Sequence, residues 1–200
     1  MKSLLLLMLL IIILTAFVIY FNRAPDRFVS GNGIISPASG TIINIAEFPS
    51  TDIVFEKEGT MNHVTVPEID GPVRAVMIEM KLSDVHVQRA PISGEILSMI
   101  HYDGTHKSAV GKVKEDIIET NEKVVTVFKN KTDIVGVVQV AGIAARRIRN
   151  SAKVPDYLNQ GDVYGRIILG SQVVVIIPNN HTITVQVGQR VVDGQTVIAE

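Results

Sequence analysis

The chain has 200 residues, which is enough for one domain with a sizeable hydrophobic core. Its 19 basic and 20 acidic residues nearly cancel, so its charge gives no indication of nucleic-acid binding. The sequence contains no cysteine, which excludes disulfides, thiolate catalysis and cysteine-ligated zinc sites.

An apolar segment opens the chain. No charged residue occurs from Leu4 to Phe21, and a helix of this length spans about 27 Å, close to the thickness of a bilayer core. A cleaved signal peptide is the alternative, but Thr15-Ala16-Phe17 matches a cleavage site poorly and the apolar run continues beyond it. We therefore predict an uncleaved membrane anchor over residues 1–21, a linker over 22–32 and one domain over 33–200.

The orientation of this anchor depends on the charges that flank it. Lys2 precedes the apolar segment, whereas Arg23 and Arg27 follow it. Because segments rich in lysine and arginine tend to stay on the cytoplasmic side, this balance favours a cell-membrane protein whose domain lies in the cytoplasm.

The rest of the chain is predicted to form short strands. Val and Ile are abundant, aromatic residues are sparse, and turn residues separate the apolar stretches. The expected strands are Thr41–Ile45, Asp52–Phe55, Val73–Met80, Val85–Gln88, Glu95–His101, Val124–Phe128 and Ile134–Ala141, with further strands in the last third. A short helix is expected over Glu115–Glu119, and Ala141–Ile148 suits either a helical turn or a continued strand. This pattern predicts a mainly β fold, a compact barrel or sandwich.

A short internal repeat indicates that this fold has two related halves. Pro37–Ile42 and Pro91–Ile96 share the pattern Pro-x-Ser-Gly-x-Ile. The glycine-rich C-terminal segment, Val187–Ala199, has a similar alternation of turn and strand. The repeat is therefore typical of a duplicated, hybrid-motif-like β domain, although a match this short also arises by chance.

One apolar run near the C-terminus contains an unexpected pair of residues. Gly165–Pro178 is predicted to be a single buried strand, except that Gly170 and Ser171 interrupt it. Glycine weakens a strand because it packs no side chain and loses more backbone entropy than other residues. The pair therefore marks either a bulge, a close approach of two backbones, or a bond that the protein itself breaks.

Of the five histidines, His86 has the most informative neighbours. Asp84, His86 and Gln88 are expected on one face of a strand, where the acid can fix the imidazole tautomer. The other histidines, His63, His101, His106 and His181, each stand alone in the sequence. No two histidines have a metal-ligand spacing, so we expect no metal site.

Six motifs, in this order, resemble those of the phosphatidylserine decarboxylase proenzymes, particularly the short membrane-anchored prokaryotic form, which includes archaetidylserine decarboxylase-like proteins. They are Phe21–Arg27, Ile35–Gly40, Asp84–Gly94, Thr120–Lys123, Gln139–Ile148 and Leu169–Ser171. The third is similar to the family's Asp-Val-His-Val-Asn-Arg-Ala-Pro-Val-Ser-Gly, and the fifth to its Gln-Ile-Ala-Gly-x-x-Ala-Arg-Arg-Ile. The last falls where the family has its self-cleavage motif.

The resemblance implies that the protein cleaves itself. Ser171 would attack the carbonyl of Gly170, with His86 as the base and Asp84 beside it, and move the acyl group from nitrogen to oxygen. Elimination and loss of ammonia would then leave a pyruvoyl group at position 171. The products would be a large chain that ends at Gly170 and a small chain from residue 171, held together because the cut lies within a sheet.

The resemblance also implies the reaction. A pyruvoyl ketone accepts the amine of a serine phospholipid and takes up the electrons released as carbon dioxide leaves. His86 is the expected acid, and Arg89, Arg146 and Arg147 are candidates for binding the lipid phosphate or for structural ion pairs. The substrate is phosphatidylserine or its ether-linked counterpart archaetidylserine, and the sequence is compatible with a homo-oligomer.

One residue departs from the family pattern. Ser39 stands where the family has an aspartate that orients the histidine, and a serine cannot stabilise an imidazolium by charge. Asp84 is a possible substitute. Ser39 therefore leaves open an uncleaved, inactive relative that acts as a membrane-tethered binding or scaffold protein. The glycine-rich C-terminal segment leaves open a carrier-like or unrelated β domain, which is disfavoured because the sequence has no Met-Lys-Met or similar exposed lysine turn.

Overall fold

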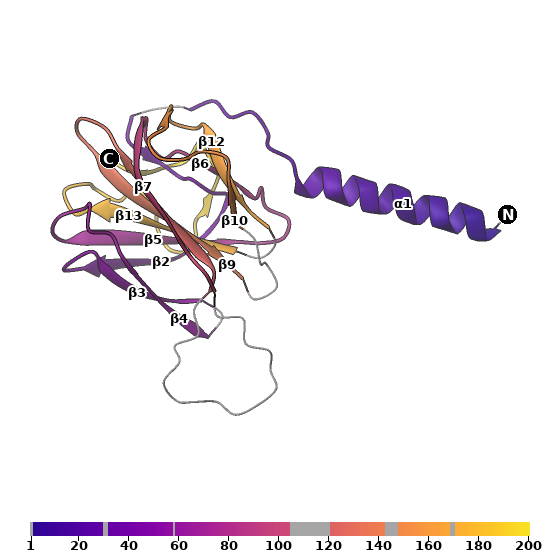
Figure 1. Cartoon of the computed structure of the whole chain (residues 1–200), viewed down its shortest axis with the longest axis horizontal. Helices are drawn as coiled ribbons and strands as arrows, with labels where there is room; N and C mark the ends of the chain where they lie inside the picture. Colours follow the sequence, from indigo (N-terminus) through magenta and orange to yellow (C-terminus); the bar gives the residue numbers. More distant parts are fainter. Residues whose placement is uncertain (1, 30–31, 58, 105–120, 143–147, 169–170) are drawn as a thin grey trace.

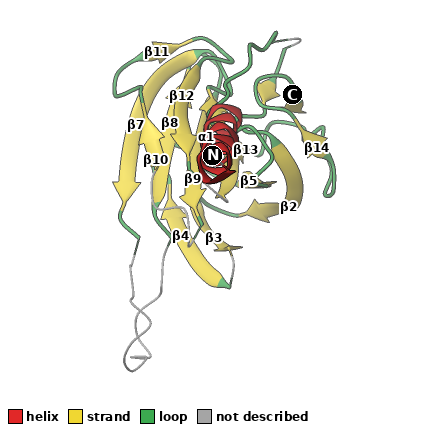
Figure 2. Cartoon of the chain, turned by 90° about the vertical axis from the view of Figure 1, so that its right-hand side faces the viewer, coloured by secondary structure: helices red, strands yellow, loops and turns green. Residues whose placement is uncertain are grey.

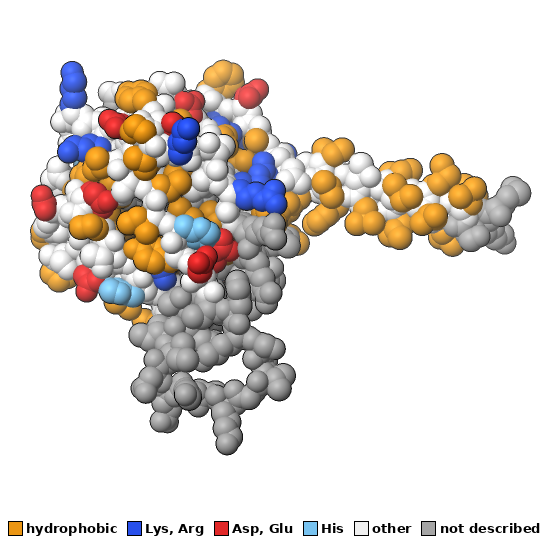
Figure 3. Space-filling view, in the orientation of Figure 1, with side chains coloured by type: hydrophobic (Ala, Val, Ile, Leu, Met, Phe, Trp, Pro, Cys, Tyr) orange, Lys and Arg blue, Asp and Glu red, His pale blue; other side chains and the backbone are white. Residues whose placement is uncertain are grey.

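The computed structural model describes residues 2–29, 32–57, 59–104, 121–142, 148–168 and 171–200. Helix α1 (Lys2–Phe21) projects from a β domain (Figure 1). The segment Leu4–Phe21 has a mean hydropathy of 3.1, and only 6% of it is buried. Hydrophobic side chains run along the projecting helix (Figure 3). By length and composition, the helix is compatible with the membrane anchor predicted from the sequence.

The β domain is built around an eight-stranded antiparallel sheet with the order β11-β7-β8-β9-β13-β5-β2-β14. Its strands are β2 (Gly40–Phe48), β5 (Val73–Met80), β7 (Gly94–Tyr102), β8 (Lys123–Lys129), β9 (Ile134–Ala141), β11 (Tyr157–Leu158), β13 (Ser171–Pro178) and β14 (Arg190–Val191). The sheet is strongly curled (Figure 2). The expected mainly β, barrel-like fold is therefore confirmed.

Three smaller sheets complete the domain. They are the hairpin of β3 (Asp52–Lys57) and β4 (Thr60–Thr65), the pair of β1 (Ile34–Ile35) and β15 (Val197–Ala199), and the three-stranded sheet of β10 (Ile148–Asn150), β12 (Val163–Ile167) and β6 (Val87–Arg89). The three-stranded sheet matters most for function, because β6 and β12 flank the candidate site.

Strand β13 explains why its sequence is almost continuously apolar. It lies between β9 and β5, near the middle of the main sheet. Val173, Val175 and Ile177 pack into one hydrophobic cluster, whereas Val174 and Ile176 pack into a second cluster on the other face. A strand that is buried on both faces needs apolar residues at every position, so it shows no alternation.

The internal repeat has a structural counterpart. Gly40 begins β2 and Gly94 begins β7, and at each a Cβ would lie within 2.4 Å of a carbonyl oxygen of the paired strand. Each strand has an irregular register shortly afterwards, between Ile42 and Asn44 in β2 and between Ile96 and Ser98 in β7. The two copies therefore use glycine for the same purpose, a close approach of two backbones.

The prediction of a single strand over Gly165–Pro178 is wrong. The run contains the end of β12 and all of β13, and these two strands belong to different sheets. The chain therefore passes from one sheet to the other between Ile167 and Ser171. Because the apolar residues on both sides are buried, hydrophobicity alone gave no indication of this change of sheet.

The strand predicted over Val85–Gln88 is also misplaced. Strand β6 covers only Val87–Arg89, and His86 lies before it. Asp84 accepts a hydrogen bond from the backbone N–H of Lys81, which closes a turn ahead of this segment. The helix expected over Glu115–Glu119 lies outside the described residues, as does most of Ala141–Ile148.

Candidate active site

His86 is held in one tautomer by the backbone. The ring is fully buried, and Nδ1 lies 2.9 Å from the carbonyl oxygen of Asp84. A carbonyl oxygen only accepts hydrogen bonds, so Nδ1 carries the proton and Nε2 has a free lone pair. Nε2 is buried and has no partner among the described residues. His86 therefore presents an unused proton acceptor in a dry environment.

The end of helix α1 covers this imidazole. The ring of Phe21, the last residue of the helix, lies 4.4 Å from the His86 ring, centroid to centroid. Burial lowers the pKa of His86 from its ordinary value of 6.5, and the positive charges of Arg166 and Arg23 lower it further, against the raising effect of Asp84. His86 is consequently neutral at pH 7 and able to act as a base.

The carboxylate of Asp84 does not contact the imidazole. It forms an ion pair with Arg190 and accepts a hydrogen bond from the backbone N–H of Lys81. Burial by itself would raise the pKa of Asp84, but the hydrogen bonds from Arg190 and Lys81 outweigh it, so the pKa is lowered. Asp84 therefore positions His86 through its main-chain carbonyl, whereas the sequence suggested a role for its side chain.

Ser171 is the first residue of β13 and is buried. In the sheet it pairs with Met80 of β5 and with Ala141 of β9. Its hydroxyl donates a weak hydrogen bond to the sulfur of Met80 at 3.2 Å. Gly170, the other half of the expected cleavage site, lies outside the described residues.

Two contacts connect the segment of His86 with that of Ser171. The carbonyl oxygen of His86 accepts hydrogen bonds from the N–H of Ile167 at 3.1 Å and from Nε2 of Gln88 at 3.2 Å. The amide of Gln88 also approaches the sulfur of Met80, the atom that Ser171 contacts. Since Ile167 precedes Ser171 by four residues, their Cα atoms lie within about 14 Å. The structure thus brings the two predicted residues into one region.

A buried amide network lies behind this region and was not anticipated from the sequence. Gln88 accepts a hydrogen bond from Gln139 at 3.0 Å, and Gln139 accepts one from Asn150 at 2.9 Å. These residues come from β6, β9 and β10, so no sequence spacing relates them. The side-chain oxygens of Gln88 and Gln139 are thus satisfied, whereas Oδ1 of Asn150 has no partner among the described residues. The two hydrogen bonds join three strands and so help to fix their arrangement.

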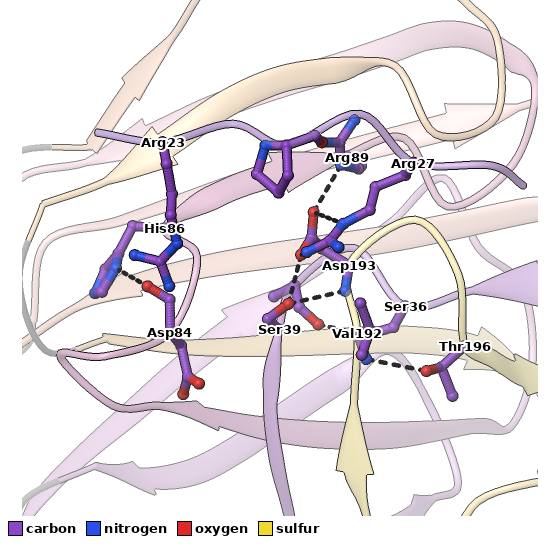
Figure 4. Close-up of polar contacts among 12 residues, drawn as sticks. Arg23, Arg27, Ser36, Ser39, Asp84, His86, Arg89, Val192, Asp193 and Thr196 are labelled. Carbon is purple, nitrogen blue, oxygen red and sulfur yellow. Dashed lines mark hydrogen bonds and ion pairs between the residues drawn. The ribbon is translucent and has the colours of Figure 1, made fainter. Parts of the chain in front are cut away.

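Ser39 belongs to a different cluster from His86 (Figure 4). Its hydroxyl contacts the carboxylate of Asp193 and accepts a hydrogen bond from the N–H of the same residue at 3.0 Å. Asp193 is fully buried and forms ion pairs with Arg27 at 2.8 Å and Arg89 at 2.7 Å. Asp193 thus places a carboxylate next to position 39, where this chain has a serine and the family motif has an aspartate.

Of the arginines predicted to bind lipid phosphate, only Arg89 lies within the described residues. Its guanidinium donates to Asp193, to the carbonyl of Gly161 and to the carbonyl of Pro25. It is buried, so these contacts fit the structural alternative better than phosphate binding. Arg146 and Arg147 lie outside the described residues.

The histidines other than His86 occupy separate positions. His63 contacts Asp52, His101 contacts Glu122, and His181 contacts Asp133. These three pairs lie in different parts of the domain, and His106 lies outside the described residues. Among the residues that the structure describes, no group of three or more potential ligands is arranged to hold a metal ion.

Comparison with known proteins gives a consistent result. Residues 14–199 match the family model described as phosphatidylserine decarboxylase. The chain belongs to the phosphatidylserine decarboxylase family. A relative from Methanocaldococcus jannaschii is 42% identical, and the alignment covers 93% of this chain and 90% of the relative. Relatives from Methanothermobacter thermautotrophicus and Methanosarcina mazei are 35% and 37% identical, over 92% and 93% of this chain and 80% and 76% of their own lengths.

All three relatives are described as proposed archaetidylserine decarboxylase proenzymes. No solved structure matches the chain. The family membership confirms the resemblance inferred from the six sequence motifs.

Proposed function

We propose that this family member decarboxylates a serine phospholipid after converting Ser171 into a pyruvoyl group. The observation that carries the proposal is the buried Nε2 of His86, which has no partner among the described residues and lies in the same region as Ser171. The family assignment over residues 14–199 supports the same reaction. Because all three relatives described above are named after archaetidylserine, we propose the ether-linked lipid first and phosphatidylserine second.

The residues around position 171 fit a pyruvoyl group. Ser171 lies at the start of a strand, and its hydroxyl contacts the sulfur of Met80. Among the described residues it forms no hydrogen bond with a charged side chain, so a small uncharged ketone would be tolerated there. Such a group supplies an electrophilic carbonyl that accepts the substrate amine and takes up the electrons released with carbon dioxide. The proton transfers and the binding of the substrate would be carried out by the chain's own side chains.

His86 would serve as the proton carrier in both stages. In self-cleavage, Nε2 takes the proton of the Ser171 hydroxyl, whose oxygen forms a bond to the carbonyl carbon of residue 170 as the peptide C–N bond breaks. The proton then goes to the freed nitrogen. In decarboxylation, the same Nε2 would first accept a proton from the ammonium group of the substrate and would then deliver it to the carbon that has lost carbon dioxide. The lowered pKa of His86 favours the first role, since it keeps the base unprotonated.

The cleaved chains are expected to stay together for a reason that differs from the sequence argument. The cut would fall between two sheets, just before β13. The small chain would still hold all of β13, which pairs along its length with β5 and also with β9. The backbone hydrogen bonds of a central strand would therefore retain it.

Helix α1 would place this reaction at a membrane. Its apolar surface and the position of Phe21 over His86 support a role as an anchor that keeps the site close to lipid headgroups. We propose a cytoplasmic position for the domain from the flanking charges, with the domain boundaries at residues 21 and 33. A homo-oligomer stays a prediction.

Intact-mass analysis of the purified full chain under denaturing conditions tests the proposal. We expect two chains, the smaller one beginning at residue 171, with a blocked amino terminus that lacks the serine nitrogen. Ser171→Ala is expected to abolish both cleavage and carbon dioxide release from serine lipid, whereas the exposed Ser50→Ala is expected to change neither. A single full-length chain after long incubation would instead support the uncleaved scaffold protein that Ser39 suggested.

A further inference from the structure

Two arginines meet at the junction between helix and domain. Arg166 of β12 donates to the carbonyls of Asn22 at 2.9 Å and Phe21 at 3.4 Å. Arg23, just after the helix, donates to the carbonyls of Tyr20 at 2.8 Å and Ser83 at 2.6 Å. Figure 3 shows basic side chains gathered where the helix joins the domain. Both guanidiniums therefore lie at the level where the proposed anchor leaves the membrane.

Within the described part of the chain, neither arginine has an acidic partner. The hydrogen bonds that they form there all go to carbonyl oxygens. The contrast with other arginines of the domain is clear, since Arg27, Arg74, Arg89 and Arg190 each pair with a carboxylate. Helix C-terminal carbonyls compensate only a fraction of a charge.

A third positive charge adds to the imbalance. Arg149 of β10 lies directly opposite Arg166 of β12 in the antiparallel register, so both side chains leave the same face of the sheet. Like charges in this position repel each other unless an anion lies between or beside them. Burial also lowers the pKa of Arg166, because the charged guanidinium has lost part of its contact with water. The junction is thus built with an excess of positive charge.

The charge excess lies next to the candidate base. Phe21, whose carbonyl Arg166 contacts, packs its ring against the His86 ring at a tilt of 37°. Arg23 and Arg166 are both close enough to His86 to lower its pKa. An anion bound by these arginines would therefore lie near the imidazole of His86 without touching it.

We propose that Arg23 and Arg166 bind the phosphodiester of the substrate headgroup and so direct its serine moiety toward His86 and Ser171. The inference rests on the proposed function and adds the residues that recognise the substrate. Each guanidinium has five N–H donors and uses two of them in the contacts above, so donors remain for phosphate oxygens. Arginine is well suited to this role because its planar fork matches a phosphate. Arg23 and Arg166 replace Arg89 as the candidate ligands.

A binding experiment without catalysis tests this assignment. In the full chain with Ser171→Ala, in detergent micelles, calorimetry measures the affinity for glycerophosphoserine, a soluble phosphodiester. Arg166→Gln should weaken binding by about 10- to 100-fold, as expected for loss of a charge-assisted hydrogen bond, and Arg166→Lys by less. The control, Arg74→Gln, removes the same charge at the far end of β5 and should leave the affinity unchanged.

Two results of the binding experiment would overturn the assignment. One is equal affinity of the Arg166→Gln and control proteins for glycerophosphoserine. The other is binding of inorganic phosphate alone, with no affinity for the diester, because the site would then recognise free phosphate and not a lipid headgroup. Neither result depends on self-cleavage, so they are distinct from a failure of the proposed function.

A second experiment separates phosphate recognition from a purely structural role at the helix end. With cleaved protein, the rates per cleaved chain are compared for a serine phospholipid and for an O-alkyl-L-serine, which has no phosphate. Arg166→Gln should lower kcat/KM for the phospholipid by about 10- to 100-fold and leave that for the phosphate-free substrate unchanged. Equal losses with both substrates would show that Arg166 only supports the fold of the site.

Discussion

The aromatic ring of Phe21 lies 4.4 Å from the imidazole of His86, so the last residue of the membrane-directed helix forms part of the wall around the candidate base. This contact joins two features that the sequence kept 65 positions apart. It excludes water from one face of the imidazole and contributes to the burial that lowers its pKa. Helix α1 therefore affects the chemistry as well as the location of the domain.

Removing this ring should change the pH dependence of self-cleavage. In Phe21→Ala, water reaches the imidazole, so the pKa of His86 should rise toward 6.5. Because the base is active only when unprotonated, the acid limb of the cleavage rate should move to higher pH. Single-turnover cleavage followed by mass spectrometry measures this shift. Phe28→Ala, which alters an exposed ring, is the control. An unchanged limb would mean that Phe21 does not desolvate His86.

His86→Gln should slow self-cleavage by about 10²- to 10⁴-fold, since glutamine retains hydrogen bonding but cannot accept the hydroxyl proton. The readout is the fraction of the chain that is cleaved as a function of time after purification. His63→Gln removes an exposed histidine on β4 and should cleave at the normal rate. If both variants cleave alike, another group is the base.

Asp84→Asn should affect stability more than catalysis. The carboxylate pairs with Arg190 while the main-chain carbonyl holds the imidazole, so the tautomer of His86 survives the substitution. We expect a loss of about 1 to 3 kcal/mol in the free energy of unfolding, measured with denaturant, and cleavage within a few-fold of normal. A large loss of cleavage in a folded variant would show that the carboxylate of Asp84 acts in cleavage, as the sequence suggested.

The stabilisation that the Asp84 carboxylate provides depends on pH because folding lowers the pKa of this group. The folded state binds the proton less readily than the unfolded chain, whose carboxyl has its ordinary pKa near 3.8. The stabilisation is therefore fully present above that value and is lost as the pH falls through the depressed folded pKa. Comparison of the wild type with Asp84→Asn should show their stabilities converging at strongly acidic pH and differing at neutral pH.

Ser39→Asp, which restores the aspartate of the family motif, should destabilise this protein. The new carboxylate would lie against the buried carboxylate of Asp193, which Ser39 now contacts as a neutral partner. We expect a loss of about 1 to 3 kcal/mol and a Tm lower by several degrees, measured by thermal unfolding. Adding Asp193→Asn should recover most of the loss. Full stability of the single variant would show that the cluster accepts a second charge.

Several features followed from the sequence because they depend on local patterns. Leu4–Phe21 is strongly apolar and carries no charge, and it forms most of helix α1. Strand β5 covers the residues Val73–Met80 that were predicted, and the repeated Pro-x-Ser-Gly pattern marks the start of β2 and of β7. The six ordered motifs were sufficient to identify the family, because a series of motifs is far more specific than any single one.

The tertiary structure decided which of these residues meet. Asp193 joins Ser39, Arg27 and Arg89 across the whole length of the chain, and no periodicity or spacing predicts such a contact. The break between β12 and β13 was hidden because Ile167, at the end of β12, is as apolar and as buried as the valines of β13. Sequence alone singled out Ser171 and His86, whereas only the folded chain placed the imidazole beneath Phe21, assigned its free nitrogen and brought Arg23 and Arg166 beside it.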